Sequence, residues 1–244
     1  MTDLVDTLIA RHGADAVLAA MQPQISDERR ERIERVLAAR LGSLTVVLED
    51  LYDPHNGAAA IRSVEAVGLQ SLHAVESRQP FEFSKKVTIG CHKWVTVHRH
   101  PDFATCAAAL RGQGMRLLAA VPDAPQSLHE LDMAQPAALV FGNEHDGLTA
   151  GAVAACDASF SIPMSGFTES LNLSVSVAVS VHTLAARRRI ALGGAGDLSE
   201  QERAYLRARW YALGTRGVQG IVERFVSERT RAGVGGQTRT GGKP

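Results

Sequence analysis

Short apolar runs, separated by stretches with helical spacing, occupy the chain from about residue 43 to residue 164. The runs are LTVVL (44–48), LHAV (72–75), WVTV (94–97), RLLAAV (116–121), AALVF (137–141) and SFSIPM (159–164). The helical stretches cover roughly residues 57–67, 102–112, 148–155 and 170–190. Continuously apolar strands that alternate with helices are typical of a parallel sheet with both faces covered. The sequence therefore predicts an α/β fold built on a parallel sheet.

Helical extensions flank this region at both ends. Residues 26–40 begin with Ser26, a predicted N-cap, and their many charges favour either a solvated helix face or a contact with an RNA backbone. The glycine-rich, basic residues 230–244 are predicted to be a flexible tail. We therefore divide the chain into a helical N-terminal extension (1–40), a central domain (41–190) and a helical C-terminal extension with its tail (191–244).

The composition limits the classes of protein to which this chain can belong. The formal net charge is zero, so no basic field covers the whole molecule, although a local basic patch is compatible with this sum. The three cysteines, Cys91, Cys106 and Cys156, match no metal or redox motif and fit a reducing compartment. No signal segment opens the chain, and no apolar run approaches the ~18 residues that span a bilayer. We expect a cytoplasmic protein without a metal or a membrane association.

The first of three polar loops that follow predicted strands is DPHNGAAAIR (53–62). Open parallel sheets bind ligands at the carboxyl ends of their strands, so such loops are candidate sites. Asn56 is predicted to cap a helix that begins near residue 58, and Gly68 is predicted to end it. Arg62 lies in the second turn, where it either pairs with Glu65 or Glu49 or stands free to meet a ligand.

The second loop is FGNEHDGL (141–148). A glycine directly after a strand permits close approach of the backbone to a ligand. The loop has neither the lysine of a P-loop nor a dinucleotide-binding glycine pattern. Two interpretations remain open: an ordinary turn in which Glu144 caps a helix, and a binding loop.

The third loop is IPMSGFTESLN (162–172), which leads into a long apolar helix. Ser170 is a plausible N-cap of this helix. Asn172 is predicted to lie inside the first turn, where its amide is available to a ligand because it can both donate and accept.

Together the three loops resemble the motifs of the TrmH/SpoU family of SPOUT-class RNA 2′-O-methyltransferases. The quoted stretches HNGAAAIR, FGNEHDGL and IPMSGFTESLNLSVSVAV occur in the order of that family, and the resemblance covers roughly residues 28–190. Within the family, the chain is most similar to the members that methylate a guanosine of the tRNA D-loop. The resemblance therefore implies methylation of the ribose 2′-hydroxyl of guanosine 18 in tRNA.

The resemblance also implies a fold and a cofactor. The SPOUT fold is a parallel α/β sheet with a C-terminal trefoil knot, and its members bind S-adenosylmethionine and form homodimers. The residues implied to bind the cofactor are Ala120, Gly142, Ile162, Met164, Leu171 and Asn172. In a homodimer, Arg62 would meet the cofactor of the partner subunit, and the apolar helix 170–184 would supply part of the interface.

Catalysis in the family is assigned to the arginine of the first motif, here Arg62. A guanidinium stays protonated at ordinary pH, so Arg62 acts either as an unusual base or as an electrostatic stabiliser of the developing alkoxide. We favour stabilisation on physical grounds. The remaining residues implied to shape the catalytic site are Asn56, Glu144, Ser170 and Asn172.

The candidate RNA contacts lie in the helix 26–40, in the stretches 84–86 and 91–100 and in the basic tail. The residues singled out in them are Arg29, Arg30, Arg32, Lys85, Lys86, His92 and Lys93. Trp94 is expected to be a core residue rather than a base-stacking one. Three alternatives to a tRNA methyltransferase remain open at this point: an rRNA ribose methyltransferase, a non-catalytic, cofactor-binding RNA assembly factor, and a plain nucleotide-binding α/β module. The absence of a phosphate-binding fingerprint weakens the third.

Overall fold

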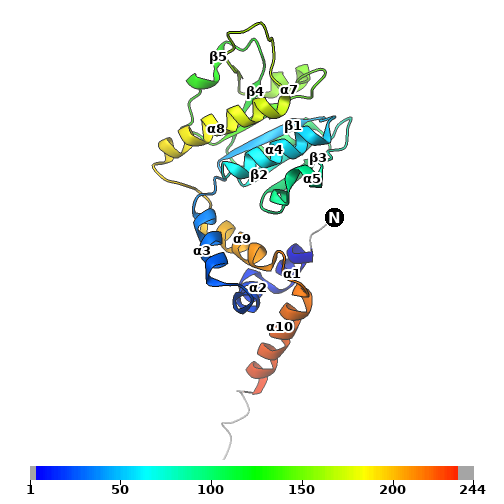
Figure 1. Cartoon of the computed structure of the whole chain (residues 1–244), viewed down its shortest axis with the longest axis vertical. Coiled ribbons are helices and arrows are strands. Elements are labelled where there is room, and N and C mark those ends of the chain that lie inside the picture. The colour runs from blue at the N-terminus through cyan, green and yellow to red at the C-terminus, as the bar shows by residue number, and fades with distance from the viewer. Residues whose placement is uncertain (1–3, 236–244) are drawn as a thin grey trace, which may run out of the picture. The chain divides into compact units, whose positions relative to one another are not determined.

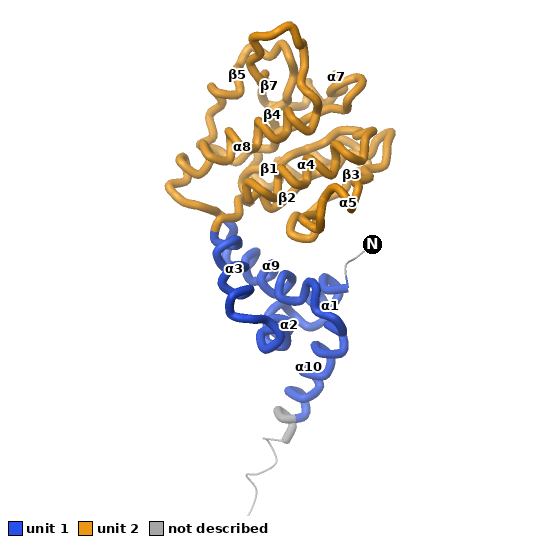
Figure 2. The backbone as a smooth tube through the Cα atoms, in the orientation of Figure 1, with its two compact units in different colours: residues 1–38, 198–244 blue, residues 39–197 orange. Residues whose placement is uncertain are grey.

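The computed structural model describes residues 4–235, with side chains as far as residue 231 (Figure 1). These residues form two compact units (Figure 2). One unit spans residues 39–197, and the other combines the residues up to 38 with those from 198 onward. The two terminal segments, which the sequence suggested as separate extensions, thus share one unit, while residues 39–40 and 191–197 belong to the larger one.

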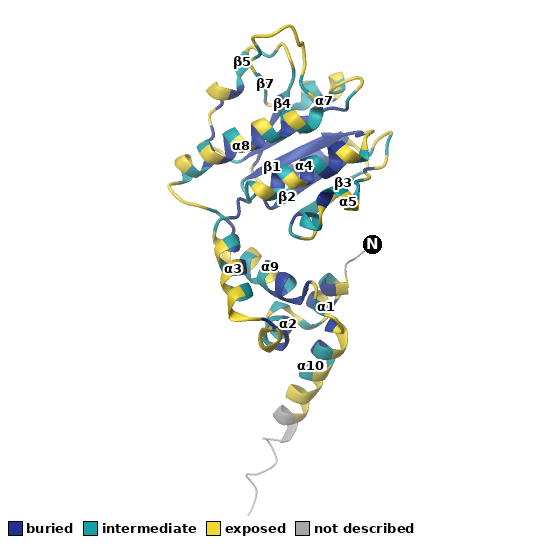
Figure 3. Ribbon diagram, viewed as in Figure 1, coloured by how far each residue is buried: buried dark blue, intermediate teal, exposed yellow. Residues whose placement is uncertain are grey.

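The larger unit is built on seven parallel strands in the order β3-β2-β1-β6-β4-β7-β5, counted over the described residues. The strands are β1 (Leu44–Glu49), β2 (Ser71–Val75), β3 (Thr96–His100), β4 (Arg116–Ala120), β5 (Gln126–Ser127), β6 (Ala137–Phe141) and β7 (Ala158–Ser161). The predicted parallel α/β sheet is confirmed. β1 and β6 are fully buried because helices cover both of their faces (Figure 3).

Two strand predictions need correction in detail, and one short strand was not predicted. β3 begins at Thr96, so the half-buried Trp94 precedes the strand instead of lying in it. β7 ends at Ser161, before Pro163, because proline has no N–H to donate to a neighbouring strand. The two-residue β5 was not predicted, since its sequence, Gln126–Ser127, has no apolar run.

Two pairs of helices cover the sheet. Helices α4 (Pro54–Ala66) and α8 (Leu173–Leu192) pack on one face, in a core that includes Ile61 and Val181. Helices α6 (Phe103–Gly112) and α7 (Ala150–Ala155) pack on the other face. The short elements α5 (Lys85–Thr88), η2 (Cys91–Lys93) and η3 (Leu128–Glu130) lie in the connections.

Helix α4 begins earlier than the sequence predicted. Its N-cap is Asp53, whose carboxylate accepts a hydrogen bond from the backbone N–H of His55 at 2.8 Å. The prediction that Asn56 caps the helix is therefore wrong, because Asn56 lies buried inside the first turn. Gly68 follows the helix end with φ of 82°, a left-handed conformation that suits glycine, and confirms the predicted terminator.

The smaller unit contains only helices among the described residues: α1 (Leu4–His12), α2 (Ala14–Met21), η1 (Gln22–Gln24), α3 (Asp27–Ala38), α9 (Glu200–Ala212) and α10 (Val218–Gly235). Ser26 accepts a hydrogen bond from the backbone N–H of Arg29 at 3.3 Å, in agreement with its predicted role as N-cap. Arg207 holds Glu34 through two hydrogen bonds of 2.7 and 2.8 Å, which join α9 to α3.

The predicted flexible tail, 230–244, starts inside a helix, because α10 continues to Gly235. Residues 236–244 lie outside the described residues. Among the residues that the structure describes, no helix combines the length and the apolar character needed to cross a membrane.

Candidate functional site

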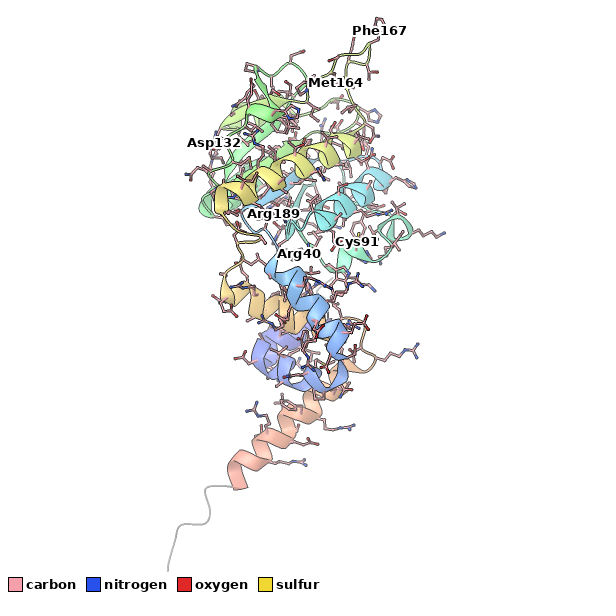
Figure 4. The ribbon with its side chains drawn as sticks, turned by 60° about the vertical axis from the view of Figure 1, so that its left-hand side comes forward. Arg40, Cys91, Asp132, Met164, Phe167 and Arg189 are labelled. Atoms are coloured by element: carbon pink, nitrogen blue, oxygen red, sulfur yellow. The ribbon has the colours of Figure 1, made fainter. Side chains whose placement is uncertain are left out.

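A cavity of about 1000 Å³ opens at the carboxyl ends of β4, β6 and β7. Its walls come from residues 120–123, 141–147, 160–164 and 166–173, together with Ser176. Figure 4 shows the third loop, labelled at Met164 and Phe167, projecting beyond the end of the sheet, and Phe167 is fully exposed. The cavity thus lies where ligands bind in open parallel sheets.

The second loop forms one wall of the cavity as a tight turn in which two backbone segments lie against each other. The backbones of Asn143 and Gly147 exchange two hydrogen bonds of 3.2 Å. A Cβ atom on Gly142 would lie only 1.9 Å from the carbonyl carbon of Gly147 and 2.1 Å from the backbone nitrogen of Leu148. Glycine is therefore required at position 142 by the close approach of the chain's own backbone, and the predicted approach to a ligand stays a prediction.

The third loop ends at a different cap from the predicted one. The Asn172 side-chain oxygen accepts hydrogen bonds from the backbone N–H of Ser174 at 2.8 Å and from its hydroxyl at 2.6 Å. Helix α8 accordingly begins at Leu173, and the prediction that Ser170 caps it is wrong. Ser170 is exposed at the cavity mouth, three residues before the helix begins.

Glu144 joins the second loop to the first. One carboxylate oxygen accepts a hydrogen bond from the Asn56 side-chain amide at 2.8 Å and from the backbone N–H of Asp53 at 3.3 Å. The other accepts from the backbone N–H of Tyr52 at 3.2 Å. Glu144 does not cap α7, because Thr149 does so. The carboxylate instead ties the cavity wall to the start of α4.

Arg62 is exposed on α4 and is absent from the lining of the cavity. Its guanidinium donates to the backbone carbonyl of Val87 at 3.2 Å. Neither acid that was considered as its partner binds it, because Glu65 pairs with the buried Arg40 at 3.0 Å and Glu49 accepts from Thr149. A simple surface ion pair therefore does not account for Arg62.

The structure gathers most of the predicted site residues around this one cavity. Those that line it are Ala120, Gly142, Glu144, Ile162, Met164, Ser170, Leu171 and Asn172. Asn56 lies behind Glu144, and Arg62 lies elsewhere on α4. The turn 121–123 and Phe167, which were not among the predicted site residues, also line the cavity. Residues 121–123 directly follow β4 and Phe167 lies in the third loop, and these positions could have indicated that they line the site.

The candidate RNA-binding residues fall into two groups. Lys85, Lys86 and Lys93 are exposed in the larger unit. His92 is partly buried and contacts the Thr88 hydroxyl at 2.8 Å, and burial followed by the charge of Lys93 lowers its pKa. It is therefore a neutral ring rather than a cation near pH 7.

The arginines of α3 form the second group. Arg29 donates to the carbonyl of Leu213 at 2.6 Å, and Arg30 pairs with Asp27 at 3.3 Å. Arg32 is exposed. Arg40, which the sequence placed on a solvated face, is only 1% exposed and donates to the carbonyl of Leu69. The fully exposed cations of this segment are thus fewer than the sequence suggests.

Comparison with known proteins identifies the family. Residues 43–182 match the model of the SpoU rRNA Methylase family, a span that contains the whole cavity. The chain belongs to the SpoU methylase family. This SpoU methylase is 34% identical over 200 residues to a tRNA (guanosine(18)-2′-O)-methyltransferase of Borreliella burgdorferi, covering 81% of this chain and 90% of that protein.

Two further similarities support the assignment of this SpoU methylase. A protein of the same description from Thermus thermophilus is 37% identical over 169 residues, which cover 69% of this chain and 87% of the relative. The crystal structure of the A. aeolicus TrmH/SpoU tRNA modifying enzyme superposes with a TM-score of 0.65 at 25% identity. That comparison covers 83% of this chain and 97% of the other.

Proposed function

We propose that this SpoU methylase transfers a methyl group from S-adenosylmethionine to the 2′-hydroxyl of a ribose in RNA, with guanosine 18 of tRNA as its target. The observation that carries the proposal is the single cavity built by the second and third loops and tied by Glu144 to the helix of Arg62. The choice of tRNA follows the names of the relatives at 34% and 37% identity. Such an enzyme would act in the cytoplasm, where its substrate is.

The residues of the cavity fit S-adenosylmethionine. The volume of about 1000 Å³ lies at the upper end of the range for small-molecule sites. The half-buried side chains of Ile162 and Leu171 offer apolar walls for an adenine ring. The buried amide nitrogen of Asn143, a wall residue, has no hydrogen-bond partner among the described residues. When bound, the cofactor supplies a methyl group activated by a sulfonium charge.

We also propose that this part of the chain forms the trefoil knot that the family resemblance implies. In its support, the chain leaves β7 beside β4 and passes through the third loop. It then returns as α8 to pack against α4 and β1, on the other side of β6. A knot needs the chain to return across strands that precede it in the sequence. The return of α8 to α4 and β1 is a path of this kind.

Arg62 is proposed to stabilise the negative charge that develops on the ribose oxygen. A guanidinium keeps its proton in proteins, and its planar fork can contact an alkoxide and a neighbouring phosphate together. Preorganised donors of this kind contribute most when they point at the charge that forms in the transition state. Asn56 and Glu144 would act by fixing the start of α4, which carries Arg62.

We propose further that a homodimer completes the site. Arg62 does not line the cavity of its own chain, and a second copy would supply it to the site. In support, Val175 and Val179 expose apolar side chains on α8, which packs beside α4. Burying these side chains against a second copy would bring Arg62 of one subunit toward the cavity of the other.

Methyl transfer from labelled S-adenosylmethionine to purified bulk tRNA and to bulk rRNA tests the function. We expect labelled tRNA, with the ribose methyl mapped to guanosine 18. Labelling of rRNA alone would favour an rRNA ribose methyltransferase, the alternative that the name of the matched family model suggests. Cofactor binding without labelling of either RNA would indicate a non-catalytic assembly factor and would overturn the proposal.

Substitution of Arg62 tests its role. Arg62→Ala should reduce kcat by at least about 100-fold, the loss typical of removing a donor that stabilises a transition-state oxyanion. Arg62→Lys should be nearly as defective because an ammonium lacks the planar fork. Calorimetric titration should show unchanged affinity for S-adenosylmethionine in both variants, since Arg62 is outside the cavity. Full turnover by Arg62→Ala would refute the assignment.

Mixing two inactive variants tests whether the site is shared. Arg62→Ala leaves the cavity intact, whereas Leu171→Glu places a charge in its apolar wall. Re-associated mixtures should recover up to about a quarter of wild-type activity, because half of the dimers are mixed and each has one intact site. No recovery, in a sample shown to exchange subunits, would place Arg62 and the cavity of one chain in the same site.

A further inference from the structure

Histidines gather at the edge of the sheet that lies away from the cavity. His73 lies on β2, and His98 and His100 lie on the edge strand β3. The register pairs His73 with Val47 on one side and with His98 on the other, so these side chains point to the same face of the sheet. This is the face that α6 covers, and Cys106 of α6 is fully buried against it.

Three potential ligand atoms converge there from three elements. The Nδ1 atom of His73 lies 3.0 Å from the Nε2 atom of His100. Together with the sulfur of Cys106, these atoms all lie within 4.8 Å of one another. His73 and Cys106 are buried and His100 is half-buried. The ring of His98 stacks on that of His73 with centroids 4.6 Å apart.

A hydrogen-bonded pair of neutral histidines would explain two of these residues but not the third. No hydrogen bond holds the thiol of Cys106 in the described structure, although it lies beside two imidazoles. Imidazole nitrogen and thiolate sulfur are the ligands that zinc prefers, and combinations of the two are frequent in its sites. The mechanism of methyl transfer uses none of these residues.

We propose that His73, His100 and Cys106 bind a zinc-like divalent transition metal. Zinc–nitrogen bonds of ~2.0–2.1 Å and a zinc–sulfur bond of ~2.3 Å in a tetrahedron require nitrogen atoms about 3.3 Å apart and a sulfur about 3.6 Å from each. The present spacing of 3.0 Å between the nitrogens needs only a small expansion, and the sulfur lies within 4.8 Å of both of them. Water fills the fourth position on the half-buried side at His100.

Burial favours the ligand forms of the histidines. Loss of solvent first, and the neighbouring histidines second, lower the pKa of His73 to about 3, so its ring is neutral at pH 7 and one of its two nitrogens carries a lone pair. In the His73–His100 hydrogen bond one nitrogen holds the proton, and metal binding through both nitrogens moves that proton to the other nitrogen of the same ring. Metal binding replaces the proton on the Cys106 sulfur with a metal–sulfur bond and releases that proton to the buffer. The metal would then link the edge strand β3 to β2 and to α6.

Titration of the full chain with Co²⁺ tests this site, because cobalt replaces zinc and is coloured. We expect one equivalent to bind, with visible bands of tetrahedral cobalt and a near-ultraviolet charge-transfer band from the sulfur. Addition of Zn²⁺ should bleach these bands and raise the melting temperature of the wild-type protein. Absence of stoichiometric binding to the wild-type chain would overturn the proposal.

Matched variants identify the ligands. Cys106→Ser, nearly the same size, should lose the charge-transfer band and the zinc-dependent rise in melting temperature. Cys156→Ser is the control, because Cys156 is a partly buried thiol that does not belong to the cluster of His73, His100 and Cys106. This variant should retain both signals. His100→Asn, at a half-buried position, should weaken cobalt binding at least ~10-fold and serves if Cys106→Ser does not fold. Retention of the sulfur band in Cys106→Ser, or its loss in Cys156→Ser, would contradict the assignment.

Discussion

At the scale of single residues, Glu144 is the point where two parts of the proposed site meet. Its carboxylate accepts three hydrogen bonds, and all three donors belong to the segment that starts α4. Asn56, one of the donors, is only 7% exposed, so its amide would lose a needed partner if the carboxylate were removed. The pair therefore connects the cavity wall to the helix that carries Arg62.

A double-mutant cycle measures this connection. Asn56→Ala and Glu144→Ala should each lower the free energy of unfolding by about 1–3 kcal/mol, since each leaves polar groups without partners. The double variant should lose less than the sum by about 1 kcal/mol or more, because the two side chains share one interaction. Urea unfolding provides the three values.

The control cycle pairs Asn56→Ala with Glu169→Ala. Glu169 is an exposed acid of the same cavity, in the third loop. These two changes should add to within about 0.5 kcal/mol. Additive behaviour of the Asn56 and Glu144 variants themselves would show that the contact contributes nothing to stability.

At the scale of secondary structure elements, the start of α8 has two roles, because it caps the helix and lines the cavity. Asn172 caps the helix and also lines the cavity, so the polarity of this segment serves both purposes. The N-cap is the residue whose side chain accepts a hydrogen bond from a backbone N–H in the first turn. Here the side chain of Asn172 accepts from the backbone N–H of Ser174, two residues ahead.

Comparison of two substitutions separates the cap from its neighbour. Asn172→Ala should lower the free energy of unfolding by about 1 kcal/mol, the usual loss when a capping side chain is removed. Ser170→Ala should change it by less than about 0.5 kcal/mol because Ser170 is exposed and lies outside the helix. Thermal or urea unfolding of both variants provides the test, and equal losses would show that the cap is assigned wrongly.

At the scale of the whole molecule, a net charge of zero leaves RNA binding to local groups of cations. The exposed Lys85, Lys86 and Lys93 come from one short stretch of the larger unit, next to Val87, whose carbonyl accepts from Arg62. Cations beside the proposed catalytic residue are well placed to bind phosphates near the target ribose. The proposed function thus requires no positive charge on the protein overall.

The salt dependence of tRNA binding tests this local patch. Each phosphate that a lysine neutralises contributes about 0.9 to the slope of log affinity against log salt concentration. Lys86→Ala should weaken tRNA binding and reduce the slope by about 1, as measured by fluorescence anisotropy over a salt series. Arg111→Ala, which removes the same charge from a side chain paired with Asp157, should leave the slope unchanged. A slope unaffected by Lys86→Ala would remove the patch from the proposed interface.

The sequence by itself determined the parallel α/β class, the positions of most strands and the three loops that carry the family motifs. These features are local, because apolar periodicity, glycine turns and short motifs are written in neighbouring residues. Even here, local patterns predicted the wrong N-caps for α4 and α8, because Asp53 and Asn172 have neighbours whose side chains could cap a helix equally well.

Only the tertiary structure decided which distant residues meet. It joined Glu144 to Asn56 across 88 positions of the chain, left Arg62 outside its own cavity and brought Cys106 beside His73. It also united the two terminal segments in one unit. Such contacts depend on strand order and register, which set the neighbours of a side chain in space and which no pattern of nearby residues encodes.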